Sequence, residues 1–493
     1  MKPSVKKLTV STLVMMITGS VISLRGLPMM AKEGLTMVFY ILFSTVLFLI
    51  PAALVSAELG SAFCDKQGGV YTWVKAAFGP RWGFVAVWMQ WIQNVIWYPT
   101  VLGFASGSLA YCIMKPELAG NGFYNGIVII LFYWFATFIA MRGAAAIGKY
   151  TKLGVIFGTI IPGIIIIALG GIWIYKGMPL AFMAGAAEAG SHFHPTFFPH
   201  ISGLGSLAFL AGIILLFAGV EVEAVYVKDM NNPGKNFPLA VLIASLIIVL
   251  LFLSGSLAVA AVVPADQISL TSGLMEAFQQ MFARFKMPFM VPVLGFLTAA
   301  GAMGGVLAWI TGPSKGLLAT AQDGELPKTL AASNSNGAPV KLLWIQGIIV
   351  TVLASLYFIM DNVSTAFFVL SAMTATLYLV MYILMYLAAL KLRYSRKDLV
   401  RTYCIPGGLP VMWLVTVIGV AGVLFSLIVG FFPPDNLPVG NPVLYVSMVA
   451  GGLILFTAVP LLIHHYRKNI VICRSEIPQK GSACNNQSAN KVI

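Results

Sequence analysis

The chain has 493 residues, of which 59% are hydrophobic and only 9% are charged, and its mean hydropathy is +0.91. A soluble domain normally carries about 25% charged residues, so this composition excludes a soluble globular protein and indicates an integral membrane protein. The net charge of +14 would fit a nucleic-acid-binding protein, but the positions of the cationic residues indicate another origin.

Long apolar runs recur from the N-terminus almost to the C-terminus. A transmembrane helix needs about 20 predominantly apolar residues, and the sequence predicts an all-α membrane protein with 12 transmembrane helices. In chain order the predicted spans are Leu8–Met30, Leu35–Ala57, Trp82–Met114, Phe123–Met141, Leu153–Tyr175, Leu204–Tyr226, Pro238–Val262, Phe289–Thr311, Leu342–Met360, Thr365–Lys391, Val411–Phe432 and Pro442–His464.

Lys and Arg residues are unequally distributed between the two sides of a membrane threaded by these spans. Most of them fall on the side of the N-terminus. The exceptions are Lys32, Lys115, Lys176, Arg284 and Lys286 on the opposite side and Arg25 within the membrane. The positive-inside rule therefore predicts a multi-pass protein of the inner (plasma) membrane with cytoplasmic N- and C-termini. The positive charge reflects orientation, and we expect no nucleic-acid partner.

The sequence lacks the common catalytic and metal-binding motifs. It contains no CxxC pair, no HExxH motif and no phosphate-binding GxxxxGK[ST] loop, and its five cysteines follow no disulfide pattern. We therefore expect no enzymatic activity, no catalytic residue, no metal site and no cofactor.

Two of the predicted spans contain residues that interrupt a helix. The first span carries Gly19 between Thr18 and Ser20, and the sixth carries Gly219. Broken backbone at membrane depth is tolerated only where protein or a watery cavity surrounds it. Gly-interrupted segments at corresponding positions of two halves point to the binding site of a secondary transporter. The sequence thus predicts breaks near Gly19 and Gly219, with a site between them.

The two breaks lie five spans apart, which indicates two five-helix halves of opposite topology. We expect a single transporter domain over residues 1–466, with repeats over about 8–175 and 204–391. Helices 11 and 12, over about 411–464, lie outside the repeats, and residues 467–493 form a basic, disordered cytoplasmic tail.

The loops between the spans carry two further features. We expect an amphipathic cytoplasmic helix near Leu317–Asp323. The external loop Lys176–Gly203 contains His192, His194 and His200, which we expect to be solvated rather than bound to a metal.

Several short motifs occur in order between the predicted spans. They are Gly68–Val74, Gly79–Phe84, Gly219–Glu221, Met230–Pro238, Gly312–Gly316, Ile405–Gly408 and Phe432–Asn436. Together they resemble the amino acid–polyamine–organocation (APC) superfamily, and within it the glutamate/GABA antiporters, over roughly Leu8 to Tyr466. The resemblance implies a 5+5 inverted-repeat fold with two additional helices, and the exchange of an amino acid for its decarboxylated product.

An amino acid offers a carboxylate and an ammonium group to such a site. Amide N–H groups that follow the first break suit the carboxylate, and the last carbonyls before each break suit the ammonium. We therefore assign substrate binding by the backbone to the residues of the two breaks. They are Thr18, Gly19, Ser20, Val21, Ile22 and Gly219. The alternative is that these small residues only allow close helix packing.

Arg25 is a charge at membrane depth, where it must face a cavity or a carboxylate. It can bind the side-chain carboxylate of an acidic substrate or pair with a glutamate such as Glu221. A third option is that its side chain extends to the outer interface near Lys32. The resemblance places an aromatic residue at this position in the glutamate/GABA antiporters.

Glu221 and Glu223 point about 200° apart on a helix, so only one of them faces a pathway. The resemblance implies that Glu221 braces the unwound segment, whereas Glu223 is expected to be an ordinary residue near the inner interface. Proton coupling is the alternative for either glutamate. Aromatic side chains near the breaks are expected to select the substrate side chain or to belong to the core. They are Phe217, Trp309, Tyr378 and Tyr382, of which Tyr378 matches a family position in the substrate path.

These observations predict an inner-membrane amino acid antiporter that works by alternating access. Its best-fitting exchange is external glutamate for internal GABA, with an arginine/agmatine-type or other amino acid/amine pair as the first alternative and a proton-coupled permease as the second. A channel would need a charge ring or filter motif, which the sequence lacks. The expected partners are small-molecule amino acids and the lipid bilayer, and a homodimer is left open.

Overall fold

The computed structural model describes residues 8–66, 68–183, 196–200, 203–360, 362–434 and 441–475. His192 and His194 lie outside the described residues, and His200 is exposed.

The described residues form helices and no β-strand. In chain order the main helices are α1 (Val10–Val21), α2 (Gly26–Ala31), α3 (Thr36–Ser44), α4 (Ile50–Ala62), α5 (Val70–Phe78), α6 (Pro80–Cys112), α7 (Gly122–Met141), α8 (Ala144–Val155), α9 (Ile161–Tyr175), α11 (Ala208–Leu216), α12 (Pro233–Ala260), α13 (Gly273–Arg284), α14 (Met290–Gln322), α15 (Val340–Ala354), α16 (Leu356–Ile359), α17 (Val363–Ser395), α18 (Gly408–Val429) and α19 (Pro442–Ser475). Short π- or 3₁₀-helical pieces are η1 (Thr45–Leu49), η2 (Pro116–Gly120), η3 (Ile156–Ile160), η4 (Ala181–Met183), η6 (Gly205–Leu207), η7 (Val222–Asp229) and η8 (Lys328–Leu330).

The lengths and compositions of these helices fit a membrane protein. Within the described residues, nine helices are long and apolar enough to cross a membrane, and two shorter apolar helices cover Val10–Val21 and Gly205–Leu216. The predicted third span coincides with α6, which has 33 residues. The predicted all-α membrane class is thus confirmed, whereas the count of 12 spans stays a prediction.

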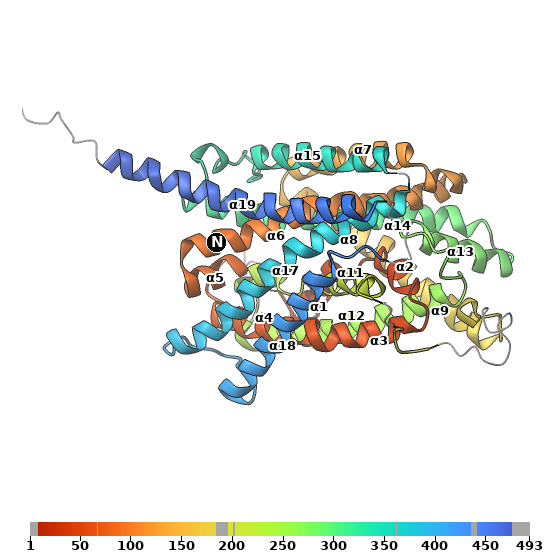
Figure 1. Cartoon of the computed structure of the whole chain (residues 1–493), viewed down its shortest axis with the longest axis horizontal. Helices are drawn as coiled ribbons and strands as arrows, with labels where there is room; N and C mark the ends of the chain where they lie inside the picture. The colour runs from red at the N-terminus through yellow and green to blue at the C-terminus, as the bar shows by residue number, and fades with distance from the viewer. Residues whose placement is uncertain are drawn as a thin grey trace, which may run out of the picture.

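The long helices run side by side along the longest axis of the molecule (Figure 1). Helix α6 packs along both α14 and α17. It begins at Pro80 directly after Gly79, whose φ of 87° turns the chain, because proline suits the first position of a helix and glycine tolerates positive φ. Helix α5 lies at the same end of the bundle as the last turns of α19, and α13 lies at the opposite end (Figure 1).

Two predicted boundaries are wrong. The eighth span does not end at Thr311, because α14 continues through Pro313 to Gln322; the predicted separate helix Leu317–Asp323 is the continuation of α14. Helix α19 also extends to Ser475, into the segment for which a disordered tail is predicted.

An ion pair joins α5 to the end of α14. The Lys75 ammonium lies 2.8 Å from Asp323, and the Tyr71 hydroxyl donates to the same carboxylate at 2.7 Å. The hydrogen bonds from Lys75 and Tyr71 hold the pKa of Asp323 below its usual value. The contact is therefore complete at neutral pH and is lost only when the pH falls through that lowered value.

A second, buried cluster anchors the chain between α17 and α18. Glu58 of α4 is 1% exposed and accepts two hydrogen bonds of 2.6 Å from the Arg393 guanidinium. Arg401 lies 3.5 Å from the same carboxylate, and the backbone N–H of Ile405 donates to it at 2.9 Å. Both oxygens of the carboxylate thus accept hydrogen bonds and lie beside a cation, as a buried ion pair requires.

We predict that Glu58→Ala destabilises the protein far more than Arg393→Ala. The first variant leaves two guanidinium groups, whose side chains are 15% and 10% exposed, without their anion, a change that costs at most about the 3–5 kcal/mol of a broken buried ion pair, whereas the second leaves Arg401 beside the carboxylate. Thermal unfolding in detergent measures the difference. The exposed pair Arg396–Asp398 in the same segment is the control, because Arg396→Ala should leave unfolding unchanged; equal midpoints for all variants would contradict the prediction.

Candidate functional site

The first predicted span is broken after Val21, not at Gly19. Helix α1 ends at Val21 and α2 begins at Gly26, and Ile22 has extended backbone angles (φ −70°, ψ 116°). Gly19 lies within α1, where an added Cβ would come within 3.3 Å of the Val155 side chain. This glycine therefore serves close helix packing, and the residues that leave the helix are Ile22 to Arg25.

The sixth span is broken where predicted, at Gly219. Its φ of 120° lies in a region that side-chain-bearing residues rarely adopt. Its N–H donates to the Tyr382 hydroxyl at 2.9 Å, and an added Cβ would lie 3.2 Å from Trp309 and 3.5 Å from Val21. The Trp309 indole donates to the Ser20 carbonyl at 3.1 Å, so Trp309 bridges the two broken helices.

Glu221 lies at the centre of a buried hydrogen-bond network. Tyr378 and Tyr382, one turn apart on α17, donate to its two carboxylate oxygens at 2.5 Å each. The Gln90 side-chain amide of α6 contributes a third hydrogen bond of 3.4 Å. This arrangement fastens the segment after the break in the sixth span to α17 and α6.

A small polar cavity of about 30 Å³ lies between the two breaks and α6. It is lined by Ser20, Val21, Ser23, Arg25, Gln93, Asn94, Trp97, Leu215, Leu216, Ala218, Trp309 and Tyr378. Arg25 Nε and Asn94 Nδ2 are buried donors without a partner among the described residues. Two unsatisfied donors in one buried cavity suit an anionic group such as a carboxylate.

The position of Arg25 excludes two of its three sequence-based interpretations. It is 2% exposed, so it does not reach an interface, and no ion pair joins it to Glu221 or to another acidic residue in the described part of the chain. Its guanidinium carbon lies 5.5 Å from the Trp97 ring centre and 5.7 Å from that of Phe367. Aromatic faces position a cation but do not neutralise it.

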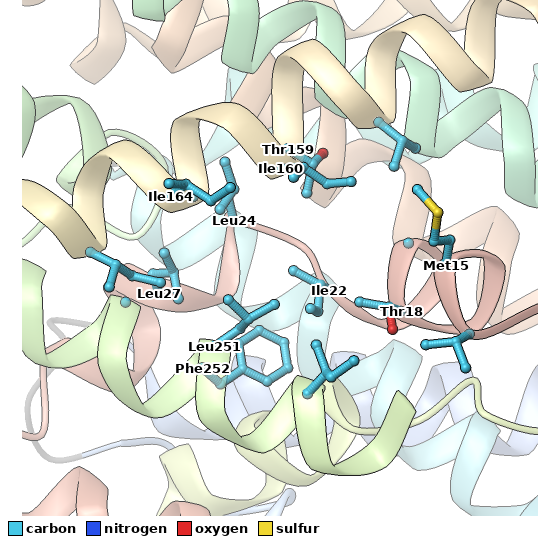
Figure 2. A pocket seen from close by; sticks show the side chains of 17 residues that line it. Met15, Thr18, Ile22, Leu24, Leu27, Thr159, Ile160, Ile164, Leu251 and Phe252 are labelled. Carbon is cyan, nitrogen blue, oxygen red and sulfur yellow. The ribbon is translucent and has the colours of Figure 1, made fainter. Parts of the chain in front are cut away.

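A second cavity, of about 260 Å³, flanks the other side of the first break (Figure 2). Figure 2 shows Thr18 and Ile22 facing Ile160 and Ile164 of the fifth span and Leu251 and Phe252 of α12. Its lining is almost wholly apolar, and Met15 and Ile164 at its edge are more than half exposed on the side of the bundle. A zwitterion would lose its hydration there without gaining hydrogen bonds.

The predicted binding residues thus line different cavities, although a third one, of about 30 Å³, is bordered jointly by Gly19, Ser20, Ile22 and Trp309. Ser20, Val21, Arg25, Trp309 and Tyr378 line the polar cavity. Thr18, Gly19 and Ile22 line the apolar cavity. Phe217 packs edge-to-face on Phe252, and Tyr382 supports Glu221 and Gly219.

Sequence reasoning missed the contribution of α6 to the polar cavity. Gln93, Asn94 and Trp97 come from this helix. With Gln90 they follow helical spacing of three and four residues on one face of an apolar segment. This polar stripe was the feature of the sequence that could have identified α6 as part of the site.

Comparisons with known proteins match transporters over most of the chain. The family model described as amino acid permease matches residues 8–455. An uncharacterized transporter of Legionella pneumophila is 40% identical over 94% of this chain and 97% of its own length. A glutamate/gamma-aminobutyrate antiporter of Lactococcus lactis is 30% identical over 93% of this chain and 90% of its own. A probable agmatine/putrescine antiporter of the same species is 24% identical over 82% and 83%.

We predict that Gly219→Ala abolishes ligand binding at the polar cavity. A residue forced into a sparsely populated backbone region costs about 1–3 kcal/mol, and the new Cβ would push Trp309 away from Ser20. Ligand-induced stabilisation of the purified variant measures the loss. Gly171→Ala is the matched control, since nothing lies within 4 Å of its added Cβ; unchanged binding by the Gly219 variant would remove this break from the site.

Proposed function

Because the chain belongs to the amino acid permease family, a family of membrane transporters, we propose that it exchanges external glutamate for internal GABA by alternating access. The observation that carries this proposal is the buried, unpaired Arg25 beside the unpartnered amide of Asn94. A buried cation without a counter-ion is costly, and a substrate carboxylate removes that cost.

Glutamate and GABA share the group that Arg25 would bind. Decarboxylation of glutamate removes only the α-carboxylate. Both molecules therefore keep the other carboxylate, which three carbons separate from the amine nitrogen. A site that holds this carboxylate therefore accepts both partners of the exchange. The ammonium group is suited to the carbonyl ends of α1 and α11, which carry partial negative charge.

The polar cavity must enlarge to admit either substrate. Its volume of about 30 Å³ holds roughly one water molecule, whereas small-molecule pockets typically occupy about 300–1,000 Å³. Separation of the broken helices α1 and α11 from α6 and α14 would provide that space. We place the termini on the cytoplasmic side of the inner membrane, in line with the distribution of cationic residues.

Arg25 disfavours the exchange of cationic amino acids. Arginine and agmatine would bring a second guanidinium into a site that already contains an unpaired one, and like charges in a buried site repel strongly. The relative named as an agmatine/putrescine antiporter is also less similar than the glutamate/gamma-aminobutyrate antiporter.

The test is uptake of radiolabelled glutamate into liposomes that contain the purified protein, with and without GABA inside. We expect uptake that depends on internal GABA. Uptake into empty vesicles driven by a proton gradient would indicate a symporter instead, and the absence of glutamate uptake would refute the proposed substrate.

In the same assay we predict that Arg25→Ala lowers the affinity for glutamate by about ten- to hundredfold, because hydrogen bonds to charged groups contribute about 1.5–3 kcal/mol. Arg284→Ala, at an exposed position of α13, controls for the loss of a positive charge. An unchanged affinity for glutamate in the Arg25 variant would place Arg25 outside the binding site.

A further inference from the structure

Glu223 is a buried carboxylate with one unsatisfied oxygen. It lies in the first turn of η7, directly after the break in the sixth span, and is 7% exposed. Its Oε1 accepts a hydrogen bond from the Ser20 hydroxyl, whereas Oε2 has no partner among the described residues. Glu221, by contrast, receives hydrogen bonds on both oxygens. The sequence-based view of Glu223 as an ordinary interfacial residue does not fit this burial.

The neighbours of η7 provide no counter-charge in the part of the chain that the structure describes. This segment packs against α1, α4 and α12. Helix α1 has no charged residue, Glu58 of α4 is already ion-paired, and Lys235 of α12 is exposed. The titratable side chains at positions 226, 228 and 229 of η7 lie outside the described residues. A buried carboxylate with one neutral donor needs either further donors or a proton.

The Ser20 hydroxyl links Glu223 to the polar cavity, because Ser20 donates to Glu223 and also lines this cavity together with Arg25 and Asn94. A hydroxyl donates one hydrogen bond and accepts two. While Glu223 is ionised, the Ser20 proton is committed to it. Once Glu223 is protonated, the carboxyl group donates to Ser20 Oγ, and the Ser20 proton becomes available to a carboxylate in the cavity.

We propose that Glu223 is a proton-binding site of the transporter, and that a proton on Glu223 and a substrate carboxylate at Arg25 bind cooperatively through Ser20. This inference rests on the proposed function, because it takes an acidic amino acid as the ligand. Linkage is reciprocal: the proton raises the affinity for glutamate by the same factor as glutamate raises the affinity for the proton. Since glutamate carries one negative charge and GABA none, a proton that accompanies glutamate makes the exchange electroneutral.

The test measures binding of radiolabelled glutamate to the full-length protein in lipid nanodiscs, at neutral and acidic pH. We expect the wild type to bind about tenfold more tightly at acidic pH, within the usual range of coupling. Glu223→Gln should bind tightly at both pH values, because its amide donates to Ser20 as the protonated acid does. Protonation of glutamate itself affects its binding to the wild type and to the Glu223→Gln protein equally, so it does not contribute to the difference between them.

Two variants serve as controls. Glu276→Gln removes a carboxyl group on α13, outside the polar cavity, and should keep the wild-type pH dependence. In the Ser20→Ala protein, glutamate binding should no longer depend on pH although Glu223 is present, since the hydroxyl that links Glu223 to the cavity is gone. In liposomes, an imposed membrane potential should change glutamate/GABA exchange by the Glu223→Gln protein and leave wild-type exchange unaffected.

The outcomes separate this inference from the proposed function. Wild-type pH dependence in the Glu223→Gln protein, or loss of glutamate binding by that variant at every pH, would overturn the proton site while leaving the proposed exchange intact. A wild-type protein that neither binds nor exchanges glutamate would refute the proposed function, and this inference with it.

Discussion

The carboxylate of Glu221 stabilises the centre of the bundle, because it completes the hydrogen bonds that the break in the sixth span leaves open. The freed N–H of Gly219 donates to Tyr382, and Tyr382 in turn donates to Glu221. Inside a bilayer no bulk water can replace these partners. The break is therefore stable only while Tyr378, Tyr382 and Gln90 surround the carboxylate. Trp309 extends this support to helix 1 through the Ser20 carbonyl, so both breaks depend on one network.

The opposite character of the two cavities follows from helical spacing in α1. Thr18 faces the apolar cavity, which Ile22 just beyond the end of α1 also lines, whereas Ser20 points about 200° away from Thr18 and reaches the polar cavity. The sequence predicts that this segment forms the site, but it does not show which face binds. The segment is apolar nearly all round, and such a helix carries no periodic signal for orientation.

Glycine and proline explain where the remaining predictions succeeded and where they failed. The two glycines at Gly19 and Gly219 look alike in sequence, but only tertiary contacts reveal that the first accommodates Val155 and the second adopts a positive φ. Similarly, a Gly-Pro pair normally terminates a helix, whereas α14 continues through Pro313. Neighbouring helices and side chains can compensate the lost backbone hydrogen bond in a membrane bundle. Run lengths thus located the long apolar helices, while breaks and ends depended on contacts that no local pattern encodes.

Under the proposed function, the buried Arg25 supplies a physical reason for exchange rather than net uptake. Closing the site around Arg25 without an anion would bury an unpaired charge, which is strongly unfavourable. A carboxylate bound beside Arg25 and Asn94 removes this penalty, and in the proposed exchange both glutamate and GABA supply one. The loaded carrier can therefore pass through a closed conformation in either direction, whereas the empty carrier meets an electrostatic barrier. In the proposed mechanism, obligatory exchange follows from one unpaired cation at membrane depth, and it requires no separate gate that senses whether a substrate is bound.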